Sequence, residues 1–325
     1  MLVSRSPLRV SYLGGGSDYP EHYRKHTGAV LGIAIAESVY VSGIRIEPSL
    51  AGHNFKISYS QVEEVEAISS IRHAPFRHAL EKINLAAGWE FSVAAGLPAH
   101  TGLGSSSSFL VATLNLIHNL TKVEISRESI VELSNLIERQ DLNQLSGLQD
   151  HLFATYGGGF LAEINLDGSY EIFPIKKESL QILEACTYLF STGTRRKADL
   201  HVQTVVKGAS AHTKEMSELA ELARAGYKVL QNSNFDIHEF GQLVNDGWKI
   251  KKQLSPLPST NQIEEIRDKL LRSGAVGTKL LGAGGGGFIA AIVPQDRIDK
   301  FESETKTLKF RKIRIDPLGA EVKEI

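Results

Sequence analysis

The order of strand-like and helix-like segments most limits the folds open to this chain. Segments of β character are, in chain order, residues 2–13, 29–46, 53–59, 91–98, 157–166, 170–175, 187–193, 276–282, 287–293 and 309–315. Segments with helical periodicity are residues 20–26, 73–87, 106–119, 126–138, 198–231, 236–253 and 260–272. Strands and helices therefore mix without the regular alternation of a doubly wound parallel sheet. The order predicts an α+β protein with antiparallel sheets.

The chain has 325 residues, which is long for one hydrophobic core and predicts two domains, at residues 1–183 and 184–325. Its formal net charge is −1, so no overall field draws it to nucleic acid or to an anionic membrane. Its one cysteine, Cys186, excludes a disulfide framework and fits a reducing compartment. No apolar run approaches the roughly 20 residues of a membrane span. These features predict a cytoplasmic protein without nucleic-acid or membrane partners.

Three stretches are rich in glycine: YLGGGSDYP at 12–20, PAHTGLGSSSS at 98–108 and KLLGAGGGGF at 279–288. The last contains G-x-G-x-x-G, but a β-prone run, FIAAIV, follows it where a dinucleotide-binding fingerprint opens a helix. No Gly-Lys-Ser/Thr of a Walker A loop occurs in the sequence. A tight hairpin accounts for part of this glycine, and the surplus indicates close approach of the backbone to a ligand.

Four consecutive serines, Ser105 to Ser108, follow Gly104 and precede an apolar helical segment. Serine is a favoured N-cap residue, so helix capping is one interpretation. Several hydroxyls beside backbone N–H groups at a positive helix terminus also form an anion site, which is the second. The stretch by itself does not decide between them.

Two carboxylates are candidates for a catalytic role. Glu138 lies at the end of an apolar helical segment, and Asp150 lies just after SGLQ. Each has a structural interpretation: a solvated helix end for Glu138, and for Asp150 the N-cap of a helix at 151–156. Phosphoryl transfer, however, uses a divalent ion to neutralise the phosphates and commonly a carboxylate to orient or deprotonate the acceptor. A glutamate and a serine hydroxyl on the metal, with an aspartate on the acceptor, would meet both needs.

Four motifs in order resemble the GHMP small-molecule kinases, which include galacto-, homoserine, mevalonate and phosphomevalonate kinases. They are SPLRVSYLGGGSDY, PAHTGLGSSSS, GLQDHLFATYGGG and KLLGAGGGGF, and they span the chain from about residue 4 to 293. The resemblance implies an N-terminal domain like domain 2 of ribosomal protein S5 and a ferredoxin-like C-terminal domain, with ATP and substrate between them. It also implies that the serine run wraps the ATP phosphates without a Walker lysine.

The resemblance carries roles onto individual residues of this chain. Asp150 matches the catalytic aspartate, and Arg9 the arginine that accompanies it. Ser106 and Glu138 match the Mg²⁺ ligands, and Asp18 the carboxylate that holds sugar hydroxyls. The other implied residues are Gly102, Gly104, Ser105, Ser106 and Ser107 for ATP, and Gly15, Gly16, Gly284, Gly285, Gly286 and Arg195 for the substrate.

The first motif narrows the choice of acceptor substrate, because galactokinases carry Glu-His where this chain has Gly15-Gly16. Loss of that carboxylate removes negative charge from the acceptor pocket. GGGSD, followed by YRKHTGAVLGIAI, looks most like the D-glycero-D-manno-heptose 7-phosphate kinases. Those enzymes phosphorylate the anomeric hydroxyl to give the 1,7-bisphosphate, on the way to nucleotide-activated heptose for surface polysaccharide. Basic residues at 24–26 and 195–197 fit a second phosphate or are plain surface charge.

Other functions stay open at this point. An L-fucokinase-like enzyme, or another kinase of the sugar 1-hydroxyl, has a related first motif. A catalytically silent sensor of sugar and ATP is the alternative outside enzymes, since a fold does not determine a function. The oligomeric state is open as well, with a homodimer among the alternatives.

Overall fold

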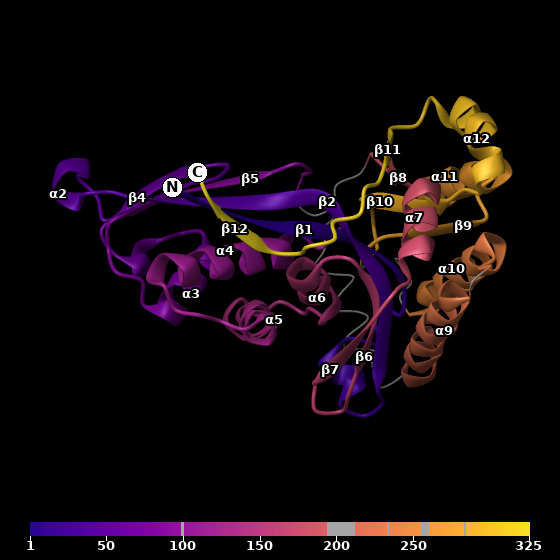
Figure 1. Ribbon diagram of the computed structural model, residues 1–325, viewed down its shortest axis with the longest axis horizontal. Helices are drawn as coiled ribbons and strands as arrows, with labels where there is room; N and C mark the ends of the chain where they lie inside the picture. Colours follow the sequence, from indigo (N-terminus) through magenta and orange to yellow (C-terminus); the bar gives the residue numbers. More distant parts are fainter. Residues whose placement is uncertain (99–100, 194–211, 233, 255–259, 283) are drawn as a thin grey trace.

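The structure is a computed structural model that describes residues 1–325 except 99–100, 194–211, 233, 255–259 and 283. Its described strands form two sheets (Figure 1). The larger has eight strands in the order β12-β1-β2-β5-β3-β4, with β6 and β7 continuing from β2. These strands are β1 (Leu2–Leu13), β2 (Gly28–Arg45), β3 (Phe55–Ser58), β4 (Val62–Val65), β5 (Trp89–Ala95), β6 (Gly159–Ile164), β7 (Tyr170–Pro174) and β12 (Glu321–Glu324).

The smaller sheet has four strands in the order β11-β8-β10-β9. They are β8 (Thr187–Ser191), β9 (Gly277–Leu280), β10 (Phe288–Ile292) and β11 (Phe310–Lys312). Every pairing in this sheet is antiparallel. In the larger sheet only β3 and β5, among the described strands, run parallel. The prediction of an α+β protein with antiparallel sheets is confirmed.

Helices from the first half of the chain cover one face of the larger sheet (Figure 1). They are α3 (Ala74–Ile83), α4 (Ser105–Thr121), α5 (Arg127–Leu136) and α6 (Gln149–Tyr156). A π-helix, Ile137–Asp141, follows α5 directly. The short elements between strands are α1 (Pro20–Tyr23), α2 (Pro48–Ala51) and 3₁₀ turns at Ile68–Ser70 and Gln295–Arg297. Buried Leu110 and Leu114 of α4 join Val10 and Ile33 of the sheet in one hydrophobic cluster.

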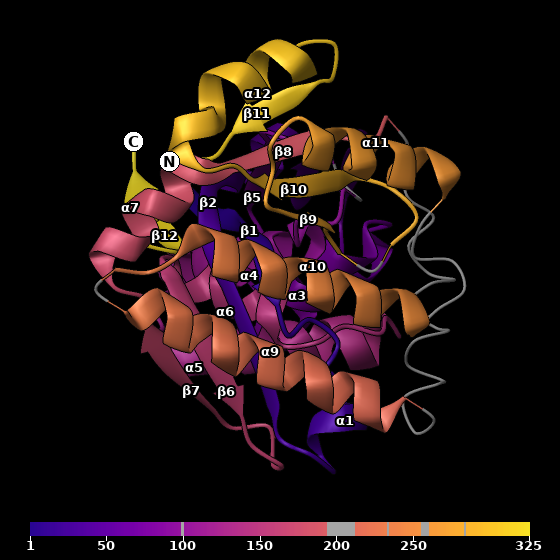
Figure 2. The same cartoon turned by 90° about the vertical axis from the view of Figure 1, so that its right-hand side faces the viewer.

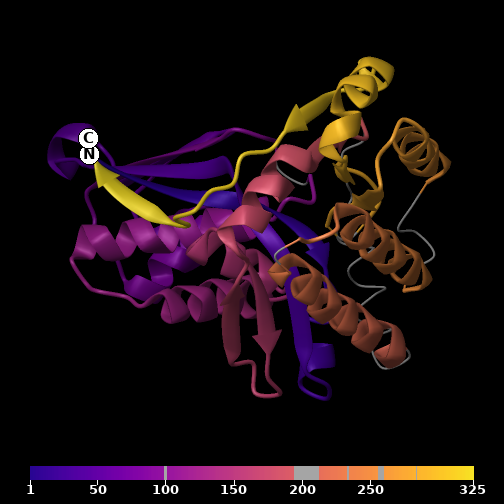
Figure 3. The ribbon, with the colours of Figure 1, turned by 45° about the vertical axis from the view of Figure 1, so that its right-hand side comes forward.

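Two long helices, α9 (Thr213–Gln231) and α10 (Ile237–Gln253), lie side by side across the molecule (Figures 2 and 3). α9 packs on β1 and β2 of the larger sheet, and α10 packs on β9 of the smaller one. Gly241 permits the second contact, because a Cβ there would lie 2.7 Å from the Val276 side chain. The remaining helices are α7 (Lys177–Cys186), α11 (Asn261–Arg272) and α12 (Ile298–Thr305). The helix pair thus joins the two sheets and sets the relative position of their edges.

The chain crosses between the sheets twice. The smaller sheet begins at Thr187, near the boundary predicted at 184, but β12 returns to the larger sheet and pairs with β1. The domain limits of 1–183 and 184–325 stay a prediction, to which the structure adds this returning strand. Of the helix predicted at 198–231, only the part from residue 212 onward falls among the described residues, and α9 begins at Thr213.

Candidate active site

A cavity of about 720 Å³ lies where the glycine-rich stretches meet. Gly15 and Gly16 of the β1–α1 loop, the serine run at the start of α4, and Gly282 from the β9–β10 connection line it. Glu138 of the π-helix and Asp150 of α6 line it as well. Segments far apart in the sequence therefore converge on one site.

The serine run does not cap its helix. α4 begins at Ser105, and the N-cap residue is Gly104, whose left-handed backbone (φ 80°) carries no side-chain cap. Ser108 is buried and donates to the carbonyl of Pro7 at 2.7 Å, which fixes the helix on β1. Ser105, Ser106 and Ser107 line the cavity at the positive end of a 17-residue helix. The capping interpretation is wrong, and the geometry favours an anion site.

The third glycine-rich stretch closes on the serine loop. β9 and β10 form an antiparallel hairpin, and its connection packs against the backbone at 101–102. A Cβ on Gly102 would lie 2.4 Å from the Leu281 carbonyl oxygen, and one on Gly287 would lie 2.2 Å from that of Thr101. Much of the glycine surplus thus serves contact between two loops. Gly282 lines the cavity, whereas the predicted substrate residues Gly284, Gly285 and Gly286 lie farther along the same connection and have positive φ.

Arg9 and Asp150 form an ion pair at the cavity wall. Both the Nε and Nη2 atoms of Arg9 lie 2.7 Å from the same carboxylate oxygen, Oδ1 of Asp150. The guanidinium also donates to the Gly102 carbonyl and is almost fully buried, while Asp150 is about a quarter exposed (24%). Both bonds to Asp150 engage Oδ1, so its Oδ2 atom takes neither of them. β1 and α6 thus hold the two predicted catalytic residues together.

Glu138 is buried at the centre of a polar chain. Its Oε2 atom accepts from the Ser107 hydroxyl at 2.9 Å and lies 2.9 Å from Nε2 of His151. The other ring nitrogen of His151, Nδ1, lies 2.9 Å from the Ser134 hydroxyl oxygen. Sequence reasoning missed His151, although it follows Asp150 directly in GLQDH. Its partner lies in the preceding π-helix, which only the fold brings within reach.

The electrostatics of Glu138 suit a carboxylate that stays charged. Burial by itself raises the pKa of Glu138, but hydrogen bonds and charge from His151, with the hydroxyls of Ser106 and Ser107, bring that pKa below its ordinary value. Carboxylate and hydroxyl oxygens are the ligands that Mg²⁺ prefers, so this donor set fits the predicted ion. Within the described ranges, His, Cys, Asp and Glu side chains nowhere gather in a group of three that could hold a metal ion.

Asp18 lies beneath the cavity rather than in its lining. It is fully buried, and its two oxygens accept from the backbone N–H groups of Gly16 at 2.9 Å and Gln149 at 3.1 Å. Burial raises the pKa of this carboxyl, which those backbone hydrogen bonds oppose. Gly147 must be glycine here, because a Cβ would lie 2.0 Å from Asp18 Oδ2. The sugar-binding role of Asp18 stays a prediction, and the geometry supports a role in joining the first motif to the Asp150 segment.

The cavity has an apolar end and a basic end. Val39, Val93, Leu97 and Phe109 line the first. At the other, Lys251 of α10 lines the wall and donates to the Gly282 carbonyl. Sequence reasoning missed Lys251, because no motif marks that part of α10.

A second lysine, Lys279, lies near the basic end of the cavity but does not line it. Lys279 is buried and donates from Nζ to the carbonyls of Ser11 and Tyr12, at 2.9 Å each. Burial, followed by the charges of Lys251 and Arg9, brings the pKa of Lys279 well below its ordinary value. The cations around this wall thus lie close enough to repel one another.

One group of predicted basic residues lies outside this cavity. Arg24 and Lys25 line a different cavity, described below. Arg195 falls outside the described residues, so its predicted contact with the substrate has no structural account. No described helix combines the length and the apolar character needed to cross a membrane.

Comparison with known proteins agrees with this geometry. Residues 71–158 match the family described as GHMP kinases N terminal domain, and residues 216–307 match GHMP kinases C terminal. The chain belongs to the GHMP kinase family. It is therefore an ATP-dependent phosphotransferase with an alcohol group as acceptor, and its two-domain α+β fold is that of the family.

Individual relatives differ in their acceptors. The chain is 26% identical over 301 residues to a D-glycero-alpha-D-manno-heptose 7-phosphate kinase of Campylobacter jejuni, covering 89% of this chain and 88% of that one. It is 29% identical over 251 residues to a mevalonate kinase of Pyrococcus horikoshii, covering 74% and 69%. Among solved structures, a D-glycero-D-manno-heptose 1-phosphate kinase from Bacteriodes thetaiotaomicron superposes with a TM-score of 0.82 at 20% identity, covering 100% and 99%. That last likeness shows a shared fold.

Proposed function

We propose that this GHMP kinase transfers the γ-phosphoryl group of ATP to the anomeric hydroxyl of D-glycero-D-manno-heptose 7-phosphate and releases the 1,7-bisphosphate. The observation that carries the proposal is the composition of the acceptor end, where Gly15 and Gly16 supply no charge and Lys251 supplies a cation. Among the described lining residues, the carboxylates are Glu138 and Asp150, and both have roles in transfer. A pocket that presents a lysine ammonium group and no carboxylate beyond these two favours a phosphorylated sugar over a neutral one. Similarity to the Campylobacter jejuni heptose 7-phosphate kinase over most of both chains supports the same acceptor.

The apolar end fits the adenine of ATP, which places the phosphates at the start of α4. Amides of Ser105 to Ser107 and the positive helix end would then face the β- and γ-phosphates. Glu138 and Ser106 would hold Mg²⁺, which neutralises charge on the transferred group. Gly102 and Gly104 let the loop turn closely enough to bring these groups to one point, since both have positive φ.

Asp150 receives the proton of the acceptor hydroxyl in this scheme. Arg9 engages Oδ1 twice, so Oδ2 is the oxygen left to face the acceptor. The anomeric hydroxyl is more acidic than an ordinary alcohol, which lowers the demand on the base that accepts its proton. The two bonds from Arg9 fix the direction of the Asp150 carboxylate.

A screen of ADP release over candidate acceptors tests the proposal. The panel contains heptose 7-phosphate, L-fucose, galactose, mevalonate and no acceptor, and phosphorus NMR identifies the product. We expect turnover with heptose 7-phosphate and a new anomeric phosphate. Turnover only with free L-fucose would favour the fucokinase alternative, and turnover only with mevalonate would exclude a sugar acceptor. Binding of ATP and sugar without ADP release from any acceptor would favour the silent sensor. A cytoplasmic location and a homodimer stay predictions.

A further inference from the structure

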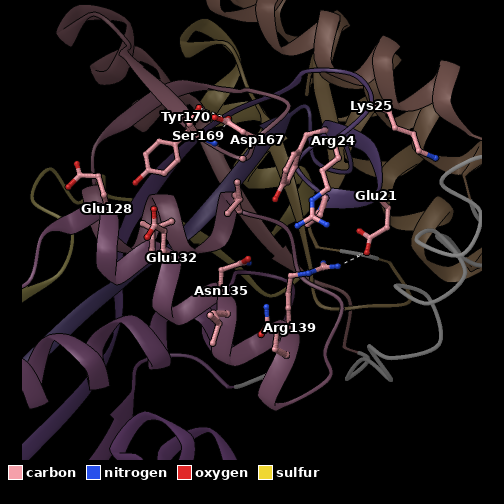
Figure 4. A pocket seen from close by; sticks show the side chains of 17 residues that line it. Glu21, Arg24, Lys25, Glu128, Glu132, Asn135, Arg139, Asp167, Ser169 and Tyr170 are labelled. Carbon is pink, nitrogen blue, oxygen red and sulfur yellow. Dashed lines mark hydrogen bonds and ion pairs between the residues drawn. The ribbon is translucent and has the colours of Figure 1, made fainter. Parts of the chain in front are cut away.

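A second cavity, of about 1070 Å³, is separate from the active site, and Figure 4 shows side chains that line it. Its walls come from α1, α5, the π-helix and the turn between β6 and β7. Arg9, Glu138 and Asp150 do not line it. The chain around Leu148 lies between the two cavities, because Leu148 lines this one while Gly147 and Gln149 line the other.

The second cavity has a basic side. Figure 4 shows the guanidinium groups of Arg24 and Arg139 directed into the same space, with Arg139 paired to Glu21. Within the described part of the chain, the Arg24 side chain takes part in no hydrogen bond or ion pair, and it is exposed. Arg139 already donates to the Ser146 carbonyl and to Glu21, so the Arg24 guanidinium beside it is the group on this side left to bind a phosphate.

The opposite side is acidic and rich in hydroxyls. Glu128 and Glu132 of α5 stand there, and Asp167, Ser169 and Tyr170 approach from the β6–β7 turn (Figure 4). Carboxylates accept hydrogen bonds from neighbouring hydroxyls of a polyol. The same negative charges repel a polyanion, so a nucleotide di- or triphosphate is a poor fit. A small molecule with one phosphate at one end and hydroxyls at the other matches both sides.

Two residues that line this cavity also hold the segment that leads to Asp150. Arg139 donates from Nη1 to the carbonyl of Ser146 at 2.6 Å, and Asn135 donates to that of Gly147 at 3.3 Å. Arg139 follows Glu138 directly in the π-helix, an irregularity that is frequent at functional sites. A ligand that engages Arg139 therefore acts on the backbone that positions Asp150 and on the helix that carries Glu138.

We propose that this cavity is a second binding site for a sugar monophosphate, and that its occupancy changes the rate of phosphoryl transfer through Arg139. The proposal needs the phosphotransferase activity of the family and does not depend on which acceptor the enzyme uses. Its ligand occupies a space separate from both the acceptor and the ATP.

Binding to the full chain is measured by calorimetry with three hexose monophosphates: mannose 6-phosphate, glucose 6-phosphate and glucose 1-phosphate. Free mannose, which lacks the phosphate, and AMP, which carries a nucleobase, serve as comparison ligands. We expect at least one hexose monophosphate to bind, and its affinity to fall about tenfold or more in both Arg24→Gln and Glu132→Gln. Arg311→Gln is the matched control, because Arg311 is an exposed arginine that pairs with Glu37 elsewhere on the surface. No binding of the three compounds, or binding that both cavity variants leave unchanged, would overturn the proposal.

The kinetic half is tested with the compound that binds. It should change the kcat or the KM of the wild type, and Arg24→Gln should keep its basal rate but lose the response. A response that survives in Arg24→Gln would place the effect in the acceptor pocket. Binding at the cavity with no change in either constant would overturn the regulatory role. If heptose 7-phosphate fails as an acceptor in the ADP screen, neither the binding test nor the kinetic test of this second site is affected.

Discussion

Replacing Asp150 by Asn distinguishes the catalytic role of this residue from its structural role. Two Arg9 donors, Nε and Nη2, converge on Oδ1 at 2.7 Å each. An asparagine can satisfy them only with its amide oxygen, so its NH₂ group takes the place of Oδ2. That group cannot receive a proton from the acceptor. We therefore expect kcat to fall about 10²–10⁴-fold, which is about 3–5 kcal/mol of transition-state stabilisation, while the KM for ATP stays within a few-fold.

The stability change should be far smaller than the kinetic one. Both hydrogen bonds to Arg9 lose a charged acceptor, and charge-assisted bonds are roughly twice as strong as neutral ones. Because Asp150 is 24% exposed, solvent screens part of that loss, and we expect about 1–2 kcal/mol. Steady-state ADP release and thermal denaturation measure the two effects. Asp141→Asn is the matched control, since Asp141 pairs with Lys82 at 3.0 Å outside the cavity lining. A turnover number in Asp150→Asn close to that of the control would refute the assignment of Asp150 as base.

Further substitutions test other parts of the site. Glu138→Gln should raise the Mg²⁺ concentration needed for half-maximal rate, because a neutral amide is a weaker ligand for a hard cation; a Mg²⁺ titration that overlays the wild type would make Glu138 structural. Gly15→Glu should reduce activity with heptose 7-phosphate well beyond Gly15→Gln and recover partly at high salt. Backbone strain is not expected, because Gly15 has an ordinary φ and a Cβ there would lie nearest to the movable Gln149 and Ser11 side chains. Equal losses in the two variants would remove the charge argument. Gly102→Ala should lower the free energy of unfolding by about 1–3 kcal/mol, because φ is +80° and the new methyl would meet the Leu281 carbonyl at 2.4 Å, which denaturant titration measures. Burial, with a smaller contribution from His26, lowers the pKa of His22 to about 4. The unfolded state therefore binds the extra proton first, and stability should fall as pH drops from about 6.5 to about 4. His22→Leu should flatten that part of a stability-against-pH profile.

Local patterns were enough to predict most of the fold. β2, α4 and α10 have long apolar periodicities, and their observed limits lie close to the predicted ones. β12 escaped prediction because three of its four residues, EVKE, are charged and it carries no apolar run. Charged residues are common on edge strands, where they discourage pairing with other molecules. Only pairing with β1 makes this segment a strand.

The sequence predicted which residues belong to the site better than it predicted the contacts those residues make. The order of the motifs pointed to Arg9 and Asp150, which lie 141 positions apart and meet at 2.7 Å. The motif did not reveal that backbone amides occupy both oxygens of Asp18. Nor did the order of residues show that Arg24 faces a different cavity from Gly15. Orientation of a side chain depends on tertiary packing, which periodicity and spacing do not encode.

The return of β12 to β1 has a consequence for biosynthesis. Leu2 pairs with Glu324, and Arg5 forms ion pairs with Asp316 and Glu321. On the ribosome, β1 emerges long before those partners, at the 5–20 residues per second typical of translation. The backbone N–H and C=O groups at the outer edge of β1 therefore stay unpaired while α9, α10 and the smaller sheet are synthesised. Such an edge can recruit the strand of another nascent chain. Among the described elements, the larger sheet is begun first, with β1, and completed last, with β12.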